Sequence, residues 1–392
     1  CLQWMFIINE NGRTSYGDSD YFTEETMKSI GIITYHHYCN YGTMLQAYAL
    51  QHKITSMGYD AELIDFMQDN SMSKLELLEL RMKRLPVYIM QRKKYAALAA
   101  ARKKNAEKAN LFEEFYRKNL VVGDTLYTSS QQLVENPPVY DGYVVGSDQT
   151  WNPYACNGPE AYLLTFVKDD KKKGSYAPSI SVTSLTDEQT EKMKKHLTGM
   201  QFLSCREFLG AELLKSILGR DVACVIDPTL LLTAAEWEKV SVPVEIKKPY
   251  ILTYFLGDVE EQRIFVNKLA EKTGFDVISI PISYLELCNN NWAQQWCGPD
   301  QFLSLIKNAA CVCTDSFHGT VFSINFNTPF FSFCKTKDNE KSSENSRLYS
   351  ALEMFGLSDR LVMGTDTPVN IGVDFSSANT VLSQKREEAS AY

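Results

Sequence analysis

The fold is decided by residues 31–66, GIITYHHYCNYGTMLQAYALQHKITSMGYDAELIDF. This stretch begins with a β-branched run over 31–35 and then turns at the polar residues 40–42. Apolar residues at helical spacing follow as far as Gly58, and a second apolar run occupies 61–66. A strand, a glycine turn, a helix and a strand in this order predict a βαβ unit. A βαβ unit implies a parallel sheet.

The same alternation of strands and helices recurs along a chain of 392 residues, which is long enough for two domains. We predict an N-terminal domain over 27–240 and a C-terminal domain over 247–370, joined by the polar, proline-containing segment 240–249. Residues 1–26 are expected to lie outside the fold, because a methionine directly precedes the first strand. Residues 371–392 are expected to form a tail. The predicted fold class is α/β, with two Rossmann-like, doubly wound domains facing each other across a cleft.

Composition narrows the class of protein. The chain is 44% hydrophobic and 22% charged, which is typical of a soluble globular protein. We find no apolar run of about eighteen residues and no secretory signal at the start of the sequence. The ten cysteines include no Cys-x-x-Cys pair, so we expect free thiols in a reduced cytosol. A net charge of −8 argues against nucleic acid as a partner.

Charge is distributed unevenly, because residues 73–120 contain thirteen Lys and Arg against five Asp and Glu. We predict that this segment is a helical insertion in the first domain, interrupted near Pro86. One interpretation is a solvated helical face. The other is transient contact with anionic lipid, which would bring the protein to a membrane-bound precursor. The predicted location is the cytoplasm, and the second interpretation places the protein at the inner face of the membrane.

A second informative stretch is ACVCTDSFHGTVFS, residues 310–323. It predicts a buried strand that stops at Asp315 and Ser316, turns through His318 and Gly319, and enters an apolar helix. Ligands bind at the carboxyl ends of strands in open α/β sheets, and helix N-termini attract anions. An imidazole also transfers protons near neutral pH. His318 is therefore a candidate catalytic residue, with a packed, satisfied histidine as the alternative.

Other strand ends carry polar residues as well. Arg206 closes an apolar strand, where its guanidinium can bind a phosphate or carboxylate through two hydrogen bonds. A buried salt bridge with Asp227 is the alternative for Arg206. Residues 40–42 and 147–149 also follow strands, and helix capping is an equal alternative for Asn40, Ser147 and Asp315.

The sequence offers no cofactor or metal motif. No Gly-x-Gly-x-x-Gly follows the first strand of either domain, and there is no Walker loop, which disfavours dinucleotide or ATP chemistry. The histidine spacing gives no zinc signature, because His36 and His37 are adjacent and His52 lies on a helix. We therefore expect no cofactor and no metal.

Five motifs in order resemble the polysaccharide pyruvyl transferase family, and the resemblance runs from about residue 30 to 362. They are NYGTMLQAYAL (40–50), VGSDQTW (145–151), CRE (205–207), DPTLLL (227–232) and TDSFHGT (314–320). The resemblance implies a GT-B-like pair of Rossmann-like domains. It also implies a transferase that moves a pyruvyl group from phosphoenolpyruvate to a sugar, usually as a ketal across two hydroxyls. The implied acceptor belongs to a cell-surface polysaccharide, such as an exopolysaccharide of the cell envelope, or to a lipid-linked glycan.

The resemblance implies roles for particular residues. In the family, residues at the positions of Arg206 and His318 bind the donor and assist proton transfer. The best-understood branch has Arg-Leu-His where this chain has Ser316-Phe317-His318, so Arg347 is expected to supply a second donor-binding arginine. The expected donor-binding residues are Arg206, Ser316, Gly319, Thr320 and Arg347. The expected acceptor-side residues are Asn40, Tyr41, Gly42, Ser147, Asp148 and Gln149.

Two other functions fit the sequence. One is a GT-B-type glycosyltransferase that uses a nucleotide sugar in the same cleft. The other is a non-catalytic module that binds glycans or organises an assembly complex. Retention of both Arg206 and His318 favours an enzyme, because a scaffold needs neither side chain.

Overall fold

The computed structural model describes residues 28–68, 91–155, 160–288, 291–335, 345–364 and 367–391. The predicted extension over 1–26 and the first part of the basic segment, up to residue 90, lie outside the described residues.

The N-terminal half contains a four-stranded parallel sheet in the order β2-β1-β3-β4. Its strands are β1 (Ser29–Ile33), β2 (Asp60–Leu63), β3 (Gly142–Val145) and β4 (Lys173–Ser175). The predicted βαβ unit is present: helix α1 (Tyr41–Ser56) connects β1 to β2. Asn40 begins this helix by accepting a hydrogen bond from the Thr43 amide. The β-branched residues of β1 are buried on both faces, as expected for a parallel strand covered by helices.

Short elements complete this half. A two-stranded parallel sheet of β5 (Ser204–Cys205) and β6 (Ala223–Cys224) follows β4. The helices are α5 (Ser130–Glu135), α6 (Asp187–Leu197), α7 (Phe208–Leu218), α8 (Pro228–Leu231) and α9 (Ala234–Val240), with 3-10 turns at Ala161–Leu163 and Asp170–Lys172. The predicted linker then leads, without helix or strand, from α9 to the second sheet.

The C-terminal half is built on a six-stranded parallel sheet in the order β12-β11-β10-β7-β8-β9. Its strands are β7 (Tyr250–Tyr254), β8 (Asp276–Ser279), β9 (Ala293–Gln294), β10 (Cys311–Thr314), β11 (Phe330–Phe333) and β12 (Leu361–Val362). Its helices are α10 (Glu260–Thr273), α11 (Tyr284–Cys288), α12 (Pro299–Lys307), α13 (Phe317–Phe326) and α14 (Asn345–Met354), with a 3-10 turn at Ser358–Arg360.

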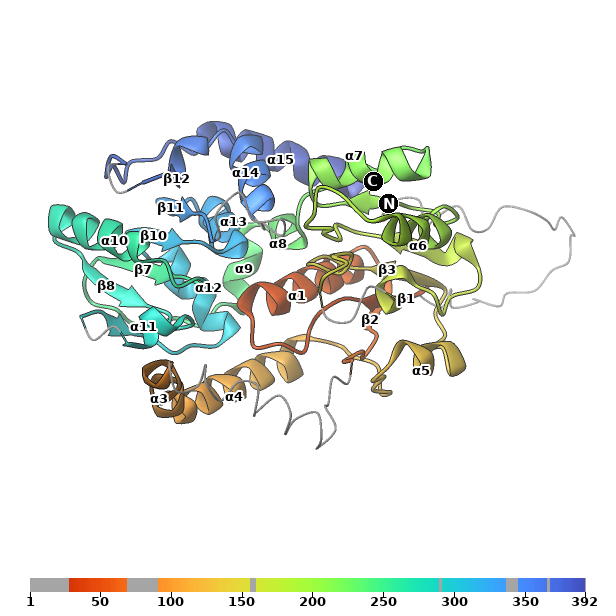
Figure 1. Cartoon of the computed structure of the whole chain (residues 1–392), viewed down its shortest axis with the longest axis horizontal. Coiled ribbons are helices and arrows are strands. Elements are labelled where there is room, and N and C mark those ends of the chain that lie inside the picture. Colours follow the sequence, from red (N-terminus) through yellow and green to blue (C-terminus); the bar gives the residue numbers. More distant parts are fainter. Residues whose placement is uncertain are drawn as a thin grey trace, which may run out of the picture.

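The two halves share a packed interface, with α1 between the two sheets (Figure 1). Tyr41 at the start of α1 stacks on Phe302 of α12 with ring centroids 4.4 Å apart. Its hydroxyl donates to the carbonyl of Cys297 over 3.0 Å. The segment expected to be a tail contains α15 (Ser376–Ala391), which returns to the middle of the molecule (Figure 1), where Arg386 donates to the carbonyl of Leu230. The predicted α/β fold of two Rossmann-like halves, each built on a parallel sheet, is confirmed.

The described part of the basic segment forms α3 (Arg92–Ala100) and α4 (Arg102–Asn119). These helices lie beside α11 and α12 of the other half, so the insertion bridges the two domains (Figure 1). Phe112 of α4 is buried, and the Nζ of Lys108 lies 4.7 Å from the ring centre of Tyr41. One face of α4 is therefore part of the core. Among the described helices, none combines the length and apolar character needed to cross a bilayer.

Candidate functional site

Four strand ends converge on the carboxylate of Asp227, which lies between β6 and α8. Nη1 of Arg206, just after β5, donates to Oδ2 of Asp227 over 2.7 Å. The Ser147 hydroxyl, just after β3, donates to the same oxygen over 3.0 Å. Nε2 of His318, in the first turn of α13, lies 3.7 Å from it. One carboxylate oxygen thus connects the arginine and the histidine that the sequence singled out.

Asp227 is held as an anion. Its other oxygen, Oδ1, accepts hydrogen bonds from the amide and hydroxyl of Thr229 and so begins helix α8. Burial by itself raises the pKa of the Asp227 carboxyl. The contact with His318, the charge of Arg206 and the Thr229 amide outweigh burial and hold the pKa well below its usual range. Asp227 therefore supplies a permanent negative charge next to the imidazole of His318.

Arg206 is almost fully buried, with 5% of its surface exposed. Its Nε lies 3.8 Å from a carboxylate oxygen of Glu207, and its guanidinium lies over the ring of Phe317 at 4.6 Å. Nε and Nη2 have no hydrogen-bond partner among the described residues. Buried N–H groups are almost always hydrogen-bonded, so these two donors mark a place for an acceptor. The salt bridge with Asp227 uses only one edge of the guanidinium.

His318 is clamped between the two halves of the molecule. A Cβ atom on Gly42, in the first turn of α1, would lie 2.0 Å from Nδ1 of His318. Only glycine at this position lets the imidazole approach the helix. Nε2 of His318 is buried without a hydrogen-bond partner among the described residues. The imidazole is thus positioned by packing while its Nε2 keeps hydrogen-bonding capacity.

A cavity of about 460 Å³ opens between the halves, a size suited to a small ligand. Arg206 and Asp227 line it from one side, and Phe317 and Arg347 line it from the C-terminal half. Arg347 lies in α14 and is 8% exposed. The structure therefore brings together Arg206 and Arg347, which were expected to share the donor. His318 is not part of the lining and reaches the site through Asp227.

The other expected donor-binding residues shape the turn around His318. The hydroxyl of Ser316 accepts from the Gly319 amide over 3.4 Å and begins α13. A Cβ atom on Gly319 would lie 2.5 Å from Oγ1 of Thr314, so glycine is needed for this close approach. The Thr320 hydroxyl donates to the Ser316 carbonyl over 3.2 Å. These three residues hold the turn, and none of them lines the cavity.

The expected acceptor-side residues divide into two groups. Gly42 and Ser147 belong to the site, through His318 and Asp227 respectively. Asp148, with a φ of 71°, accepts from the Thr43 hydroxyl over 2.7 Å and so connects the β3 loop to α1. The other three residues have local contacts. Asn40 caps α1, and Tyr41 lies in the core between the halves. The Gln149 side chain accepts a hydrogen bond from Asn152 over 2.8 Å.

Sequence reasoning missed three members of this site. Asp227 was considered only as a salt-bridge partner, although it is the centre of the arrangement. Glu207 follows Arg206 and accepts a hydrogen bond from Ser179. Phe317 packs against the Arg206 guanidinium. The signals for Asp227 were its place at the start of the DPTLLL motif and its position between a strand and Pro228, and the second is typical of a helix cap.

A family model described as polysaccharide pyruvyl transferase matches residues 40–333. No curated protein gives a match. Among solved structures, UDP-GlcNAc 2-epimerase from Neisseria meningitidis bound to UDP-GlcNAc has 11% identity and a TM-score of 0.44, with 92% of this chain and 100% of that chain covered. The Methanocaldococcus jannaschii UDP-GlcNAc 2-epimerase in complex with UDP-GlcNAc and UDP has 14% identity, a TM-score of 0.40, and 91% and 99% coverage. The glycosyltransferase VinC in complex with DTDP has 12% identity, a TM-score of 0.36, and 93% and 95% coverage.

Proposed function

Because this chain belongs to the polysaccharide pyruvyl transferase family, we propose that it transfers a pyruvyl group from phosphoenolpyruvate to a sugar of a cell-surface polysaccharide or lipid-linked glycan. One observation carries the choice of donor. Arg206 is buried, lines a cavity of about 460 Å³, and keeps two nitrogen atoms, Nε and Nη2, without a hydrogen-bond partner among the described residues. A buried guanidinium with free donors is suited to a phosphate or carboxylate, and phosphoenolpyruvate carries both.

The donor would bind between the two halves. Arg206 contributes Nε and Nη2 from the N-terminal half, and Arg347 contributes a second guanidinium from α14. The carboxylates of Asp227 and Glu207 keep Arg206 in place. Two arginines in the lining of one cavity would bind both anionic ends of one small molecule and hold its enol carbon in a defined position.

The reaction needs one proton delivered and two removed. The methylene carbon of phosphoenolpyruvate gains a proton, and the neighbouring carbon becomes an electrophile. A sugar hydroxyl bonds to this carbon and loses its proton. A second hydroxyl then bonds to the same carbon as the C–O bond to phosphate breaks, and the proton of this hydroxyl leaves with the phosphate, which gives inorganic phosphate and the ketal. His318 would carry the proton as general acid and base, and Asp227 would stabilise its protonated form.

The acceptor sugar would approach from the side of α1 and the β3 loop. Gly42 touches the imidazole there, and Asp148 is joined to Thr43. We further propose that the chain works in the cytoplasm, where α3 and α4 contact anionic lipid transiently and bring a lipid-linked acceptor to the site. Binding to phosphatidylglycerol vesicles that weakens with salt would support this contact, and absence of binding would remove it.

The function is tested by incubating the purified full chain with phosphoenolpyruvate and candidate glycans while inorganic phosphate is measured. We expect acceptor-dependent phosphate release, together with a glycan heavier by one pyruvyl ketal in mass spectrometry. A parallel thermal-shift series uses phosphoenolpyruvate and a panel of nucleotide sugars. Stabilisation by nucleotide sugars alone would favour a glycosyltransferase. Absence of any turnover or stabilisation would favour a binding module.

A further inference from the structure

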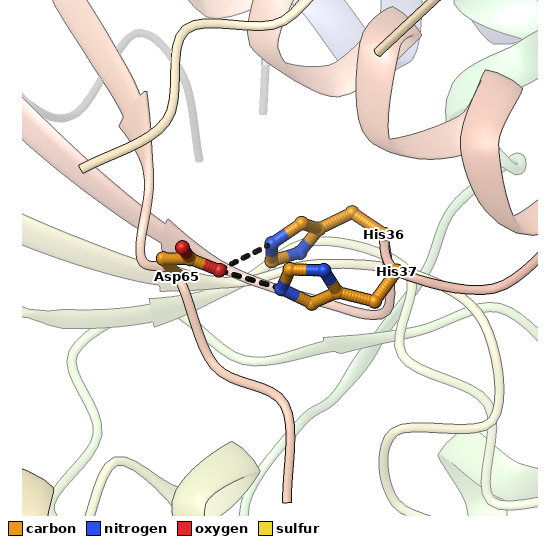
Figure 2. Close-up of side chains that lie close together, drawn as sticks. All are labelled: His36, His37 and Asp65. Atoms are coloured by element: carbon orange, nitrogen blue, oxygen red, sulfur yellow. Dashed lines mark hydrogen bonds and ion pairs between the residues drawn. The ribbon is translucent and has the colours of Figure 1, made fainter. Parts of the chain in front are cut away.

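A second cluster of chemically active side chains lies in the N-terminal half, at the carboxyl ends of β1 and β2. His36 and His37 follow β1, and Asp65 follows β2 (Figure 2). Each offers one ligand atom, and the three atoms lie within 4.8 Å of one another. The adjacency of the two histidines gave no zinc signature in the sequence, but the parallel pairing of β1 with β2 adds a third ligand from 28 residues further on.

The protonation of His36 is set by its backbone neighbour. Its Nδ1 lies 2.8 Å from the carbonyl oxygen of Thr34. Because a carbonyl can only accept, Nδ1 carries the hydrogen, and in the neutral ring Nε2 carries a lone pair. This Nε2 is fully buried, has no hydrogen-bond partner among the described residues, and lies 3.6 Å from Oδ1 of Asp65. The buried lone pair of His36 therefore faces the carboxylate of Asp65, and the two repel each other. A positive charge between them would remove this repulsion.

The described surroundings of Asp65 supply no permanent cation. The two ion-pair partners described for its carboxylate are His36 and His37. Nε2 of His37 lies 2.5 Å from the same oxygen, Oδ1. Figure 2 shows both imidazoles directed at the Asp65 carboxylate, so the three ligand atoms lie together. Two imidazoles and one carboxylate form a donor set that suits a divalent transition metal.

The spacing fits such an ion. Ligand atoms that bind one Zn²⁺ tetrahedrally at about 2.0–2.1 Å lie roughly 3.3–3.4 Å from each other. The 3.6 Å separation is close to this value, and the 2.5 Å separation must widen by less than about 1 Å. Next to the imidazoles lies a space of about 10 Å³, bordered by Tyr35 and Phe66. This is on the order of the room that one water molecule needs. The hydrogen bond from His36 to the Thr34 carbonyl is the kind of outer contact that orients metal-bound histidines.

We propose that His36, His37 and Asp65 bind one divalent transition metal ion of the Zn²⁺ class, with water in the fourth position. The ion would connect the segment after β1 to the end of β2. That segment leads directly into Asn40 and Gly42, and Gly42 touches His318. The metal would thereby hold the start of α1 in the position that clamps the imidazole of the other site. Its role is structural and independent of the proposed donor.

The experiment titrates the full chain, stripped with a chelator and dialysed, with Zn²⁺ in calorimetry and with Co²⁺ in visible spectroscopy. We expect one Zn²⁺ per chain, a rise in Tm on Zn²⁺ addition, and a Co²⁺ spectrum of low-coordinate nitrogen and oxygen ligation without a thiolate charge-transfer band. H37Q and D65N should each lower Zn²⁺ affinity by at least ~100-fold and abolish the Tm shift, because each removes a ligand. Both side chains are partly exposed, so the variants are expected to fold.

The matched control is H52Q, because His52 lies exposed on α1 and should leave metal binding unchanged. Cys39 and Cys288 are exposed thiols, so the titration is repeated in a C39S/C288S variant, which must still bind one ion. Failure of Zn²⁺ to bind, or equal affinity in wild type and D65N, would overturn the proposal. The proposal is also overturned if the Tm of wild type changes with the protonation of histidine and does not change on Zn²⁺ addition. In that case the cation between His36 and Asp65 is a proton. These readouts do not depend on turnover.

Discussion

Two histidines of this molecule lie next to an aspartate at the carboxyl ends of parallel strands, one pair across the two halves and the other within the N-terminal half. Nε2 of His318 lies 3.7 Å from Asp227, and Nε2 of His36 lies 3.6 Å from Asp65. The two pairs differ in the third partner of the carboxylate. Arg206 neutralises Asp227, whereas a second histidine, His37, faces Asp65.

The third partner decides what each pair is suited to bind. At Asp227 the positive charge is already present, and the remaining donors of Arg206 are left for an anion. At Asp65 no permanent cation is present among the described residues, and the lone pair of His36 is left for a metal ion. The same pair of residue types is therefore adapted to opposite charges by one neighbouring side chain.

The largest expected effect is that of H318A on turnover. Removal of a general acid and base costs about 10²- to 10⁴-fold in rate, so we expect pyruvyl transfer to fall within this range while the Tm stays near that of wild type. The measurement is phosphate release with phosphoenolpyruvate and acceptor. H196Q, which changes a histidine on α6 that does not line the cavity, serves as control. Turnover within a few-fold of wild type would remove His318 from the catalytic machinery.

Next in size is the loss of stability in D227N. The change leaves Arg206 charged and buried without its main partner, which costs about 3–5 kcal/mol. The pKa of Asp227 is held below its ordinary value of 3.8. The charge of Asp227 therefore makes its full contribution to the free energy of unfolding above about pH 4, and this contribution is lost as the pH falls further. Urea unfolding at several pH values should show a difference between wild type and D227N that is constant near neutrality and shrinks below about pH 4. A difference independent of pH would contradict the anionic state of Asp227.

A smaller effect on rate is expected from G42A. The new Cβ would lie 2.0 Å from Nδ1 of His318 and force the imidazole to move. A displacement of about 1 Å can cost up to ~100-fold in rate, so we expect kcat to fall by at least ~10-fold with little change in phosphoenolpyruvate affinity. G123A is the matched control, because its Cβ would lie 3.5 Å from Oη of Tyr140, which is an ordinary van der Waals distance. Equal activity of G42A and wild type would show that the clamp on His318 is not needed.

Much of the fold could be predicted from sequence because its signals are local. The β-branched run, the turn at Gly42 and the helical spacing up to Gly58 identified the βαβ unit. The bounds of β5 and β6 were harder, because these strands have only two residues each and their ends are set by pairing with each other. One interpretation of the basic insertion was a solvated helical face, yet α4 buries Phe112 and Lys108 against α1.

The sequence identified residues of the candidate site, but it did not predict which of them contact one another. Arg206 and His318 were found because each is a functional side chain at a strand end. Their common partner Asp227 was assigned a structural role, because nothing local distinguishes a helix-capping aspartate from one that also binds an arginine and faces an imidazole. The same limit applied to His36 and Asp65, which become neighbours only when β1 pairs with β2.

The central claim is that Arg206 and Arg347 bind phosphoenolpyruvate between the two halves, and calorimetric titration tests it most directly. Loss of charged hydrogen bonds costs about 1.5–3 kcal/mol each, so R206Q and R347Q should each weaken the Kd by roughly 10- to 100-fold. R117Q, which changes an exposed arginine on α4, should bind as wild type does. R347Q keeps the test valid if R206Q fails to fold. Unchanged phosphoenolpyruvate affinity in R347Q and in folded R206Q, or no binding to wild type, would contradict the account.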